Sequence, residues 1–199
     1  MSLKRVCVFC GSSPGVRPEY ARAAKALGIL LARRRIGLVF GGGKVGMMGR
    51  LAQAAQENGG EVIGVIPRDL FEKRVGFSDL ADLRVVASMH ERKALMAELA
   101  DGFMALPGGL GTLEEIFEAL TWGQLGMHQK PCGLLNVAGY FTPLLAFLDQ
   151  VTEQGFVDAE HRAMVISAEN PEDLLDQFET YRPPAADKAE WALGKEHFS

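Results

Sequence analysis

The chain has 199 residues, of which 48% are hydrophobic and 23% charged, as in an ordinary globular protein. Its net charge of −4 argues against a nucleic-acid-binding protein that relies on bulk positive charge. No apolar run reaches the roughly 18 to 20 residues of a membrane-spanning helix, and the N-terminus lacks the pattern of a signal peptide. We therefore expect a cytoplasmic protein that binds neither nucleic acid nor membrane.

Short β-branched runs alternate with longer helical patterns along the chain, which is typical of a parallel sheet flanked by helices. Strands are expected at 5–9, 38–40, 61–66, 83–86, 102–106, 132–135 and 164–166, with helices at 18–34, 47–58, 90–100, 113–125, 141–153 and 171–181. In the first helix, Tyr20, Ala24, Leu27 and Leu31 recur three or four residues apart and predict a stripe that faces the sheet.

These elements predict a doubly wound α/β domain with a mainly parallel sheet of about seven strands and helices on both faces. We expect one domain over residues 1–181, because this length is enough for a single core. Pro183 and Pro184 then break the pattern, so residues 182–199 are expected to form a tail. Trp191 and Phe198 leave open that this tail packs on a neighbour.

The three cysteines cannot form a fully paired disulfide framework, which favours a reducing compartment. Cys7 and Cys10 spell C-x-x-C, a spacing also found in redox and zinc sites. Cys7 falls in an expected strand, however, and zinc would need two further ligands where only Cys132 remains. We expect these thiols to be structural, and we expect no metal or cofactor.

Three expected strands are followed by loops rich in glycine. These loops are Gly11-Ser12-Ser13, Gly41-Gly42-Gly43 and Pro107-Gly108-Gly109-Leu110-Gly111-Thr112. Glycine lets backbone N–H groups approach an anion, and parallel sheets bind ligands beyond the carboxyl ends of their strands. A phosphorylated ligand is therefore expected, although each loop alone could simply make a tight turn. Neither the P-loop pattern nor G-x-G-x-x-G after the first strand is present.

Charged residues follow two of the expected strands. Arg92 and Lys93 lie at the start of a helix, where cations oppose the helix dipole unless an anion is close by. Glu115 lies just after the third glycine loop and could stabilise positive charge or position a water molecule. Thr112 and Glu115 also have the spacing of a capping box, which would make both of them structural.

The motif Pro107-Gly108-Gly109-x-Gly111-Thr112-x-x-Glu115 closely resembles the signature of the LONELY GUY family. Further stretches agree with it: residues 6–13, 41–43, 64–67, 89–93 and 121–126. The resemblance spans roughly residues 4 to 181. It implies a Rossmann-like fold, a homodimer, and hydrolysis of a cytokinin riboside 5′-monophosphate or AMP to the free base and ribose 5-phosphate. Members often carry the label lysine decarboxylase, but no pyridoxal phosphate site with its lysine and acidic partner is evident.

Carried over by position, the resemblance implies a catalytic pair, Arg92 and Glu115. The 5′-phosphate would lie on the third glycine loop, with help from Lys93 or Arg92. The full set of implied substrate-binding residues is Gly11, Ser12, Gly42, Gly43, Met89, Lys93, Gly108, Gly109, Leu110, Gly111, Thr112, Leu113, Glu114 and Thr121.

The sequence departs from the family pattern in one loop. Many members carry an acidic residue where gapless matching places Arg74, and Glu72 is a candidate substitute two residues away. A second function class stays open: a carrier that binds a nucleotide or a phosphorylated cofactor without turnover. The combination of Arg92 with Glu115 favours the enzyme, because a simple carrier does not require it.

Overall fold

The computed structural model describes residues 3–73 and 75–184 of the chain. Seven strands form one sheet, and every pair of neighbouring strands is parallel. They are β1 (Arg5–Phe9), β2 (Gly37–Phe40), β3 (Val62–Pro67), β4 (Asp82–Val86), β5 (Gly102–Ala105), β6 (Cys132–Leu135) and β7 (Val165–Ala168). Their order across the sheet is β4-β3-β2-β1-β5-β6-β7. The expected doubly wound, parallel architecture is confirmed.

The helices are α1 (Pro18–Arg34), α2 (Gly46–Glu57), α3 (Arg68–Glu72), α4 (Met89–Leu99), α5 (Leu110–Gln124), α6 (Thr142–Glu153), α7 (Ala159–Arg162) and α8 (Pro171–Thr180), with a 3₁₀ turn, η1 (Val137–Gly139). All six expected helices are present. The sequence interpretation missed α3, α7 and η1, because three to five residues are too few to show helical periodicity.

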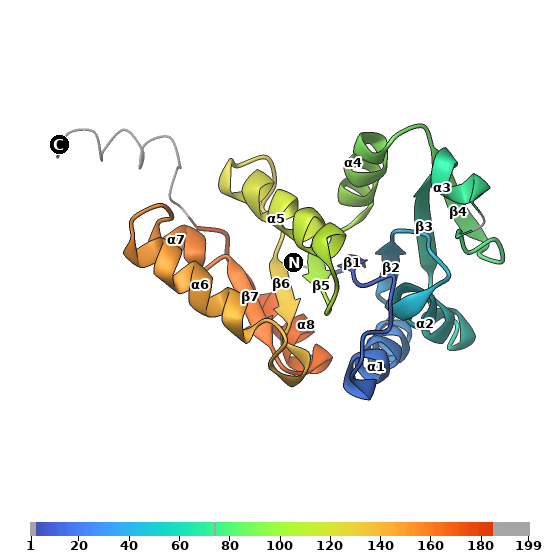
Figure 1. Cartoon of the computed structure of the whole chain (residues 1–199), viewed down its shortest axis with the longest axis horizontal. Coiled ribbons are helices and arrows are strands. Elements are labelled where there is room, and N and C mark those ends of the chain that lie inside the picture. Colours follow the sequence, from blue (N-terminus) through green and yellow to red (C-terminus); the bar gives the residue numbers. More distant parts are fainter. Residues whose placement is uncertain (1–2, 74, 185–199) are drawn as a thin grey trace.

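Helices cover both faces of the sheet (Figure 1). A hydrophobic core lies under the helices on each face. On one face α1, α2 and α8 cover the sheet, and the expected stripe of α1 is confirmed, since Ala24, Leu27 and Leu31 are fully buried. On the other face α4 and α5 bury Met96, Ile116 and other apolar residues against the strands. These five helices are thus held against the sheet by apolar residues, which leaves the loops at the strand ends available for function.

The three cysteines are buried and free. Cys7 belongs to the core under α4 and α5, whereas Cys10 belongs to the core under α1 and α2. Burial raises the pKa of the Cys7 and Cys10 thiols strongly, and it raises the pKa of Cys132 to about 12. The structure therefore supports structural thiols rather than a redox or zinc pair.

The direction of strand addition reverses between β1 and β5. From β1 the sheet grows through β2, β3 and β4 on one side, and through β5, β6 and β7 on the other. The crevice outside the carboxyl ends of two such strands is the usual ligand site of an open α/β sheet. The first and third glycine loops follow these two strands.

Two expectations concern regions that the structure describes only in part. Of the expected tail at 182–199, residues 185–199 lie outside the described residues, as does Arg74. Among the residues that are described, no helix combines the length and apolar character that crossing a bilayer requires.

Candidate active site

The first and third glycine loops are joined directly. The backbone N–H of Gly11 donates to the Pro107 carbonyl at 3.1 Å, and a Cβ on Gly11 would lie 3.4 Å from the Cα of Gly108. The Gly11 carbonyl in turn accepts from the Met47 N–H of α2 at 3.0 Å. The two loops on either side of the reversal point therefore form one surface, and Ser12 is exposed on it.

The third loop opens α5 without a side-chain cap. Gly109 is the N-cap residue, and α5 begins at Leu110, three residues earlier than expected. A Cβ on Gly109 or Gly111 would meet no atom within 4 Å, and Leu110 is 86% exposed. The first N–H groups of this helix have no partner within the helix, so the loop presents backbone donors and a positive dipole end to open space.

Thr112 and Gly108 shape this loop from inside. The Thr112 side chain is buried, and a Cβ on Gly108 would lie 2.1 Å from its hydroxyl oxygen and 2.8 Å from the Gly11 nitrogen. Only glycine fits at position 108. The capping-box interpretation of Thr112 and Glu115 is wrong, because Thr112 lies inside the first turn of α5 and the Glu115 carboxylate contacts Arg92 instead.

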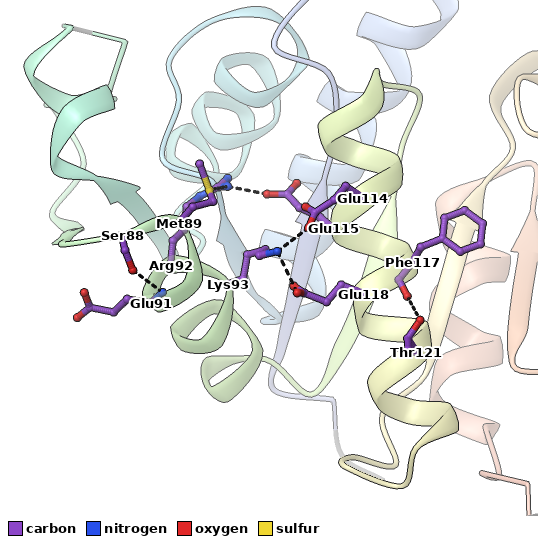
Figure 2. A network of polar contacts seen from close by, with 10 residues as sticks. All are labelled: Ser88, Met89, Glu91, Arg92, Lys93, Glu114, Glu115, Phe117, Glu118 and Thr121. Carbon is purple, nitrogen blue, oxygen red and sulfur yellow. Dashed lines mark hydrogen bonds and ion pairs between the residues drawn. The ribbon is translucent and has the colours of Figure 1, made fainter. Parts of the chain in front are cut away.

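Arg92 of α4 and Glu115 of α5 point toward one another (Figure 2). The Arg92 Nη1 donates to the Glu115 Oε1 at 2.6 Å, and only 11% and 12% of the two side chains is exposed. The Arg92 Nε donates to the Val65 carbonyl of β3 at 3.1 Å, and Nη1 also lies 3.2 Å from the Met89 sulfur. The guanidinium is therefore fixed in position by contacts from α4, β3 and α5.

Burial raises the pKa of the Glu115 carboxyl, and the nearby Arg92 charge only partly offsets this effect. The carboxyl is thus less acidic than an exposed glutamate, which suits a group that takes up a proton during a reaction. A buried carboxylate with a raised pKa beside a fixed arginine, next to a glycine loop, is the arrangement of a candidate catalytic site.

Lys93 makes a second ion-pair cluster beside the first. Its Nζ contacts the carboxylates of Glu114 and Glu118, the latter at 2.9 Å, and the lysine side chain is 11% exposed. Burial lowers the pKa of Lys93, but the two carboxylates raise it by more. These carboxylates and Glu115 are the anions that make two cations tolerable at the start of α4. Helix α4 is itself capped by Ser88, whose hydroxyl accepts from the Glu91 N–H at 3.1 Å.

Four other implied substrate contacts lie apart from this cluster: Gly42, Gly43, Leu113 and Thr121. Gly42 and Gly43 are buried, with Cβ positions blocked by Ile66 and Met48 respectively, so the second loop is packed against protein rather than open. The Thr121 hydroxyl donates to the Phe117 carbonyl within α5, at 2.7 Å (Figure 2). Leu113 is partly buried in the core beneath α5.

Sequence reasoning missed Gly41. A Cβ at this position would lie 2.0 Å from the Arg92 Nη2, so Gly41 leaves the space that the guanidinium occupies. The glycine run drew attention to the loop, but only the structure shows that its first member faces Arg92. Glu72, the candidate substitute for an acidic residue at 74, is exposed at the end of α3.

The fold and this site define a Rossmann-like α/β protein with an open glycine loop at a helix start and a buried acid–arginine pair at the reversal point. Residues 48–178 match the family described as "possible lysine decarboxylase". The cytokinin riboside 5′-monophosphate phosphoribohydrolase LOG7 of Arabidopsis thaliana is 51% identical over 180 residues, which is 90% of this chain and 83% of LOG7. LOG1 of the same plant is 47% identical over 96% of this chain and 91% of its own length.

Solved structures agree on the fold. A molybdenum cofactor binding protein from Rippkaea orientalis aligns with a TM-score of 0.68 and 25% identity, covering 90% of this chain and 98% of the other. The molybdenum cofactor carrier protein of Chlamydomonas reinhardtii aligns with a TM-score of 0.66 and 22% identity, over 89% and 98% of the two chains. The chain belongs to the "possible lysine decarboxylase" family, within which its curated relatives are the LOG phosphoribohydrolases.

Proposed function

We propose that this protein hydrolyses the N-glycosidic bond of cytokinin riboside 5′-monophosphates, of AMP, or of both, releasing the free base and ribose 5-phosphate. The observation that carries this proposal is the Arg92–Glu115 pair beside the open third glycine loop. Relatives named for this reaction are about half identical over most of the chain, which supports a phosphoribohydrolase and not a lysine decarboxylase.

The residues provide the parts that this reaction needs. Breaking the glycosidic bond develops positive charge on the ribose, as in other glycoside hydrolyses. The Glu115 carboxylate stabilises that charge and takes a proton from the attacking water, whose oxygen forms the new bond to C1′. Arg92 stabilises the electron pair that leaves with the base, which then gains a proton from solvent, while Glu115 releases to solvent the proton that it took from the water. The sum is one nucleotide and one water converted to base and ribose 5-phosphate.

Binding of the phosphate would orient the substrate. The uncapped start of α5, with Gly108, Gly109, Gly111 and Thr112, offers backbone donors for the 5′-phosphate. Lys93 adds positive charge beside them. Because the phosphate lies away from the bond that breaks, its binding energy would go into holding C1′ against Glu115.

A carrier is the second candidate, and the molybdenum cofactor binding protein from Rippkaea orientalis favours it, since that protein shares the fold at 25% identity. One assay separates the two functions. The purified protein is incubated with AMP and with isopentenyladenosine 5′-monophosphate, and free base and ribose 5-phosphate are followed by chromatography. We expect release of base from at least one of these nucleotides. Tight binding of both without release would establish the carrier instead.

We further propose a homodimer. Helix α6 has an apolar sequence but no buried residue, and Leu125, Met127, Phe147 and Phe156 on or near α5, α6 and α7 are 55–78% exposed. These elements also enclose a hollow of about 150 Å³ lined by Leu120, Leu148, Thr121 and others. An apolar surface of this kind is typical of a subunit interface, and the proposed substrate contact of Thr121 belongs to this part of the molecule.

Light scattering tests the dimer. We expect a mass of twice the 21.6 kDa chain, and a Phe147→Asp variant that shifts toward the single chain. Only the 21.6 kDa species in the unmodified protein would disprove the dimer. We also propose a cytoplasmic location, which the three free and buried thiols support.

A further inference from the structure

Tyr140 lies at the end of an unusual turn between β6 and α6. Ala138 has φ +53° and Gly139 has φ +74°, so two consecutive residues adopt the left-handed conformation. For alanine this conformation costs free energy, and such residues persist only where the surroundings hold them. Here the Arg17 guanidinium from the start of α1 donates to the Ala138 carbonyl at 3.3 Å. The turn therefore has a fixed geometry, which sets the direction of the next residue, Tyr140.

The Tyr140 ring is held from two sides. It meets the Tyr20 ring edge-on, with centroids 5.6 Å apart, and the Phe141 ring edge-on at 5.0 Å. Its hydroxyl donates a 2.6 Å hydrogen bond to the Gly108 carbonyl, although 40% of the residue is exposed. A side chain from the β6–α6 turn thus reaches the third glycine loop, which lies 32 residues earlier in the sequence.

The hydrogen bond fixes the peptide between Gly108 and Gly109. A trans peptide is planar, and its C=O and N–H point in opposite directions. When Tyr140 holds the Gly108 oxygen, it also turns the Gly109 N–H away from itself. Gly109 is the N-cap residue of α5, where no side chain makes a capping hydrogen bond, and it faces open space. No capping side chain therefore competes with Tyr140 in orienting this peptide.

We infer that Tyr140 is a positioning residue of the nucleotide site: by holding the Gly108 carbonyl, it aims the Gly109 N–H at the substrate's phosphate. The inference rests on the proposed function in taking a nucleotide 5′-phosphate as the ligand of this loop. Tyr140 itself does not touch the reacting atoms, so its loss acts on binding of the phosphate rather than on bond cleavage.

The test compares Tyr140→Phe with Tyr20→Phe. Both variants keep their ring contact, but the Tyr20 hydroxyl makes no hydrogen bond within the described residues, so this variant is a matched control. Removing one neutral hydrogen bond is expected to raise KM for the nucleotide about 2- to 10-fold in Tyr140→Phe. The inhibition constant of ribose 5-phosphate should rise by the same factor, with kcat nearly unchanged. Tyr20→Phe should behave like the unmodified protein.

Unchanged KM and inhibition constant in Tyr140→Phe would overturn the inference, as would an equal loss in Tyr20→Phe, which would indicate ring packing alone. A fall in kcat without a change in KM would also contradict it. Titration calorimetry with ribose 5-phosphate keeps the two proposals separate. If the unmodified protein releases no base, the proposed hydrolysis fails, while weaker ribose 5-phosphate binding by Tyr140→Phe still supports its positioning role.

Discussion

Substituting Gly41 by alanine should disable the site without touching either catalytic residue. The new Cβ would lie 2.0 Å from the Arg92 Nη2 and 3.2 Å from Cζ, whereas Cβ atoms essentially never approach another heavy atom within 3.0 Å. The backbone at Gly41 does not have a positive φ, so alanine itself fits there. The guanidinium must therefore move by about 1 Å, although it is held at 2.6 Å by Glu115 and at 3.1 Å by the Val65 carbonyl.

The size of the effect follows from the bonds that this movement weakens. A hydrogen bond to a charged group contributes about 1.5–3 kcal/mol, which corresponds to a loss of about 10- to 150-fold in kcat/KM if it is realised in the transition state. Because the guanidinium is the flexible end of a side chain, we expect the protein to fold and to melt within a few degrees of the unmodified chain.

A double-mutant cycle isolates the cause. Lysine at position 92 has no Nη2, so Gly41→Ala should cost little further activity in an Arg92→Lys background. The assay is base release from the preferred nucleotide by the four proteins, with thermal unfolding measured in parallel. Full activity in Gly41→Ala, or an equal loss in both backgrounds, would refute the assignment of Gly41 as the residue that makes room for Arg92.

Three further results are expected. Because burial raises the pKa of Glu115 and hydrolysis needs its carboxylate, kcat/KM should fall on acidification with a midpoint above the ordinary value of 4.5, and a midpoint at or below it would contradict this. Gly111→Ala should fold normally and raise KM, because a Cβ on Gly111 meets no protein atom. Gly108→Ala should lower the melting temperature, because a Cβ on Gly108 collides with Thr112. Thermal unfolding and KM measurements distinguish the two variants. Lys93→Met should lower the free energy of unfolding by about 0.5–1 kcal/mol, since its ion pairs are partly exposed; urea titration showing no change would disprove this.

The main helices and strands were predictable because their apolar stripes obey simple periods. Strand β1 and helix α1 begin and end where the sequence predicts, and β6 does as well. Helix α5 begins three residues earlier than the sequence predicts, because residues 108–111 include three glycines and therefore have low intrinsic helix propensity. Packing overrides propensity there, through the buried Thr112 side chain that fills the space above Gly108.

The candidate site was predictable in part. Its place at the strand ends followed from the glycine loops. The pairing of Arg92 with Glu115 followed only from the family resemblance, because the two residues lie 23 residues apart on different helices and no local sequence pattern joins them. The roles of Gly41 and Tyr140 could not be predicted, because they depend on how closely separate loops approach one another. The role of Thr112 could not be predicted either. Its spacing from Glu115 indicates a capping box, but the Thr112 side chain is buried and the Glu115 carboxylate pairs with Arg92.

The most direct test of this account is the rate of base release by Glu115→Gln from whichever nucleotide the unmodified protein hydrolyses, measured with enzyme in excess. Calorimetry with ribose 5-phosphate and thermal unfolding confirm that the variant binds and folds. We expect a loss of at least about 100-fold in the rate, with ribose 5-phosphate binding retained, because the amide can neither take the water's proton nor carry negative charge. A variant that releases base at the unmodified rate would contradict the catalytic role of Glu115.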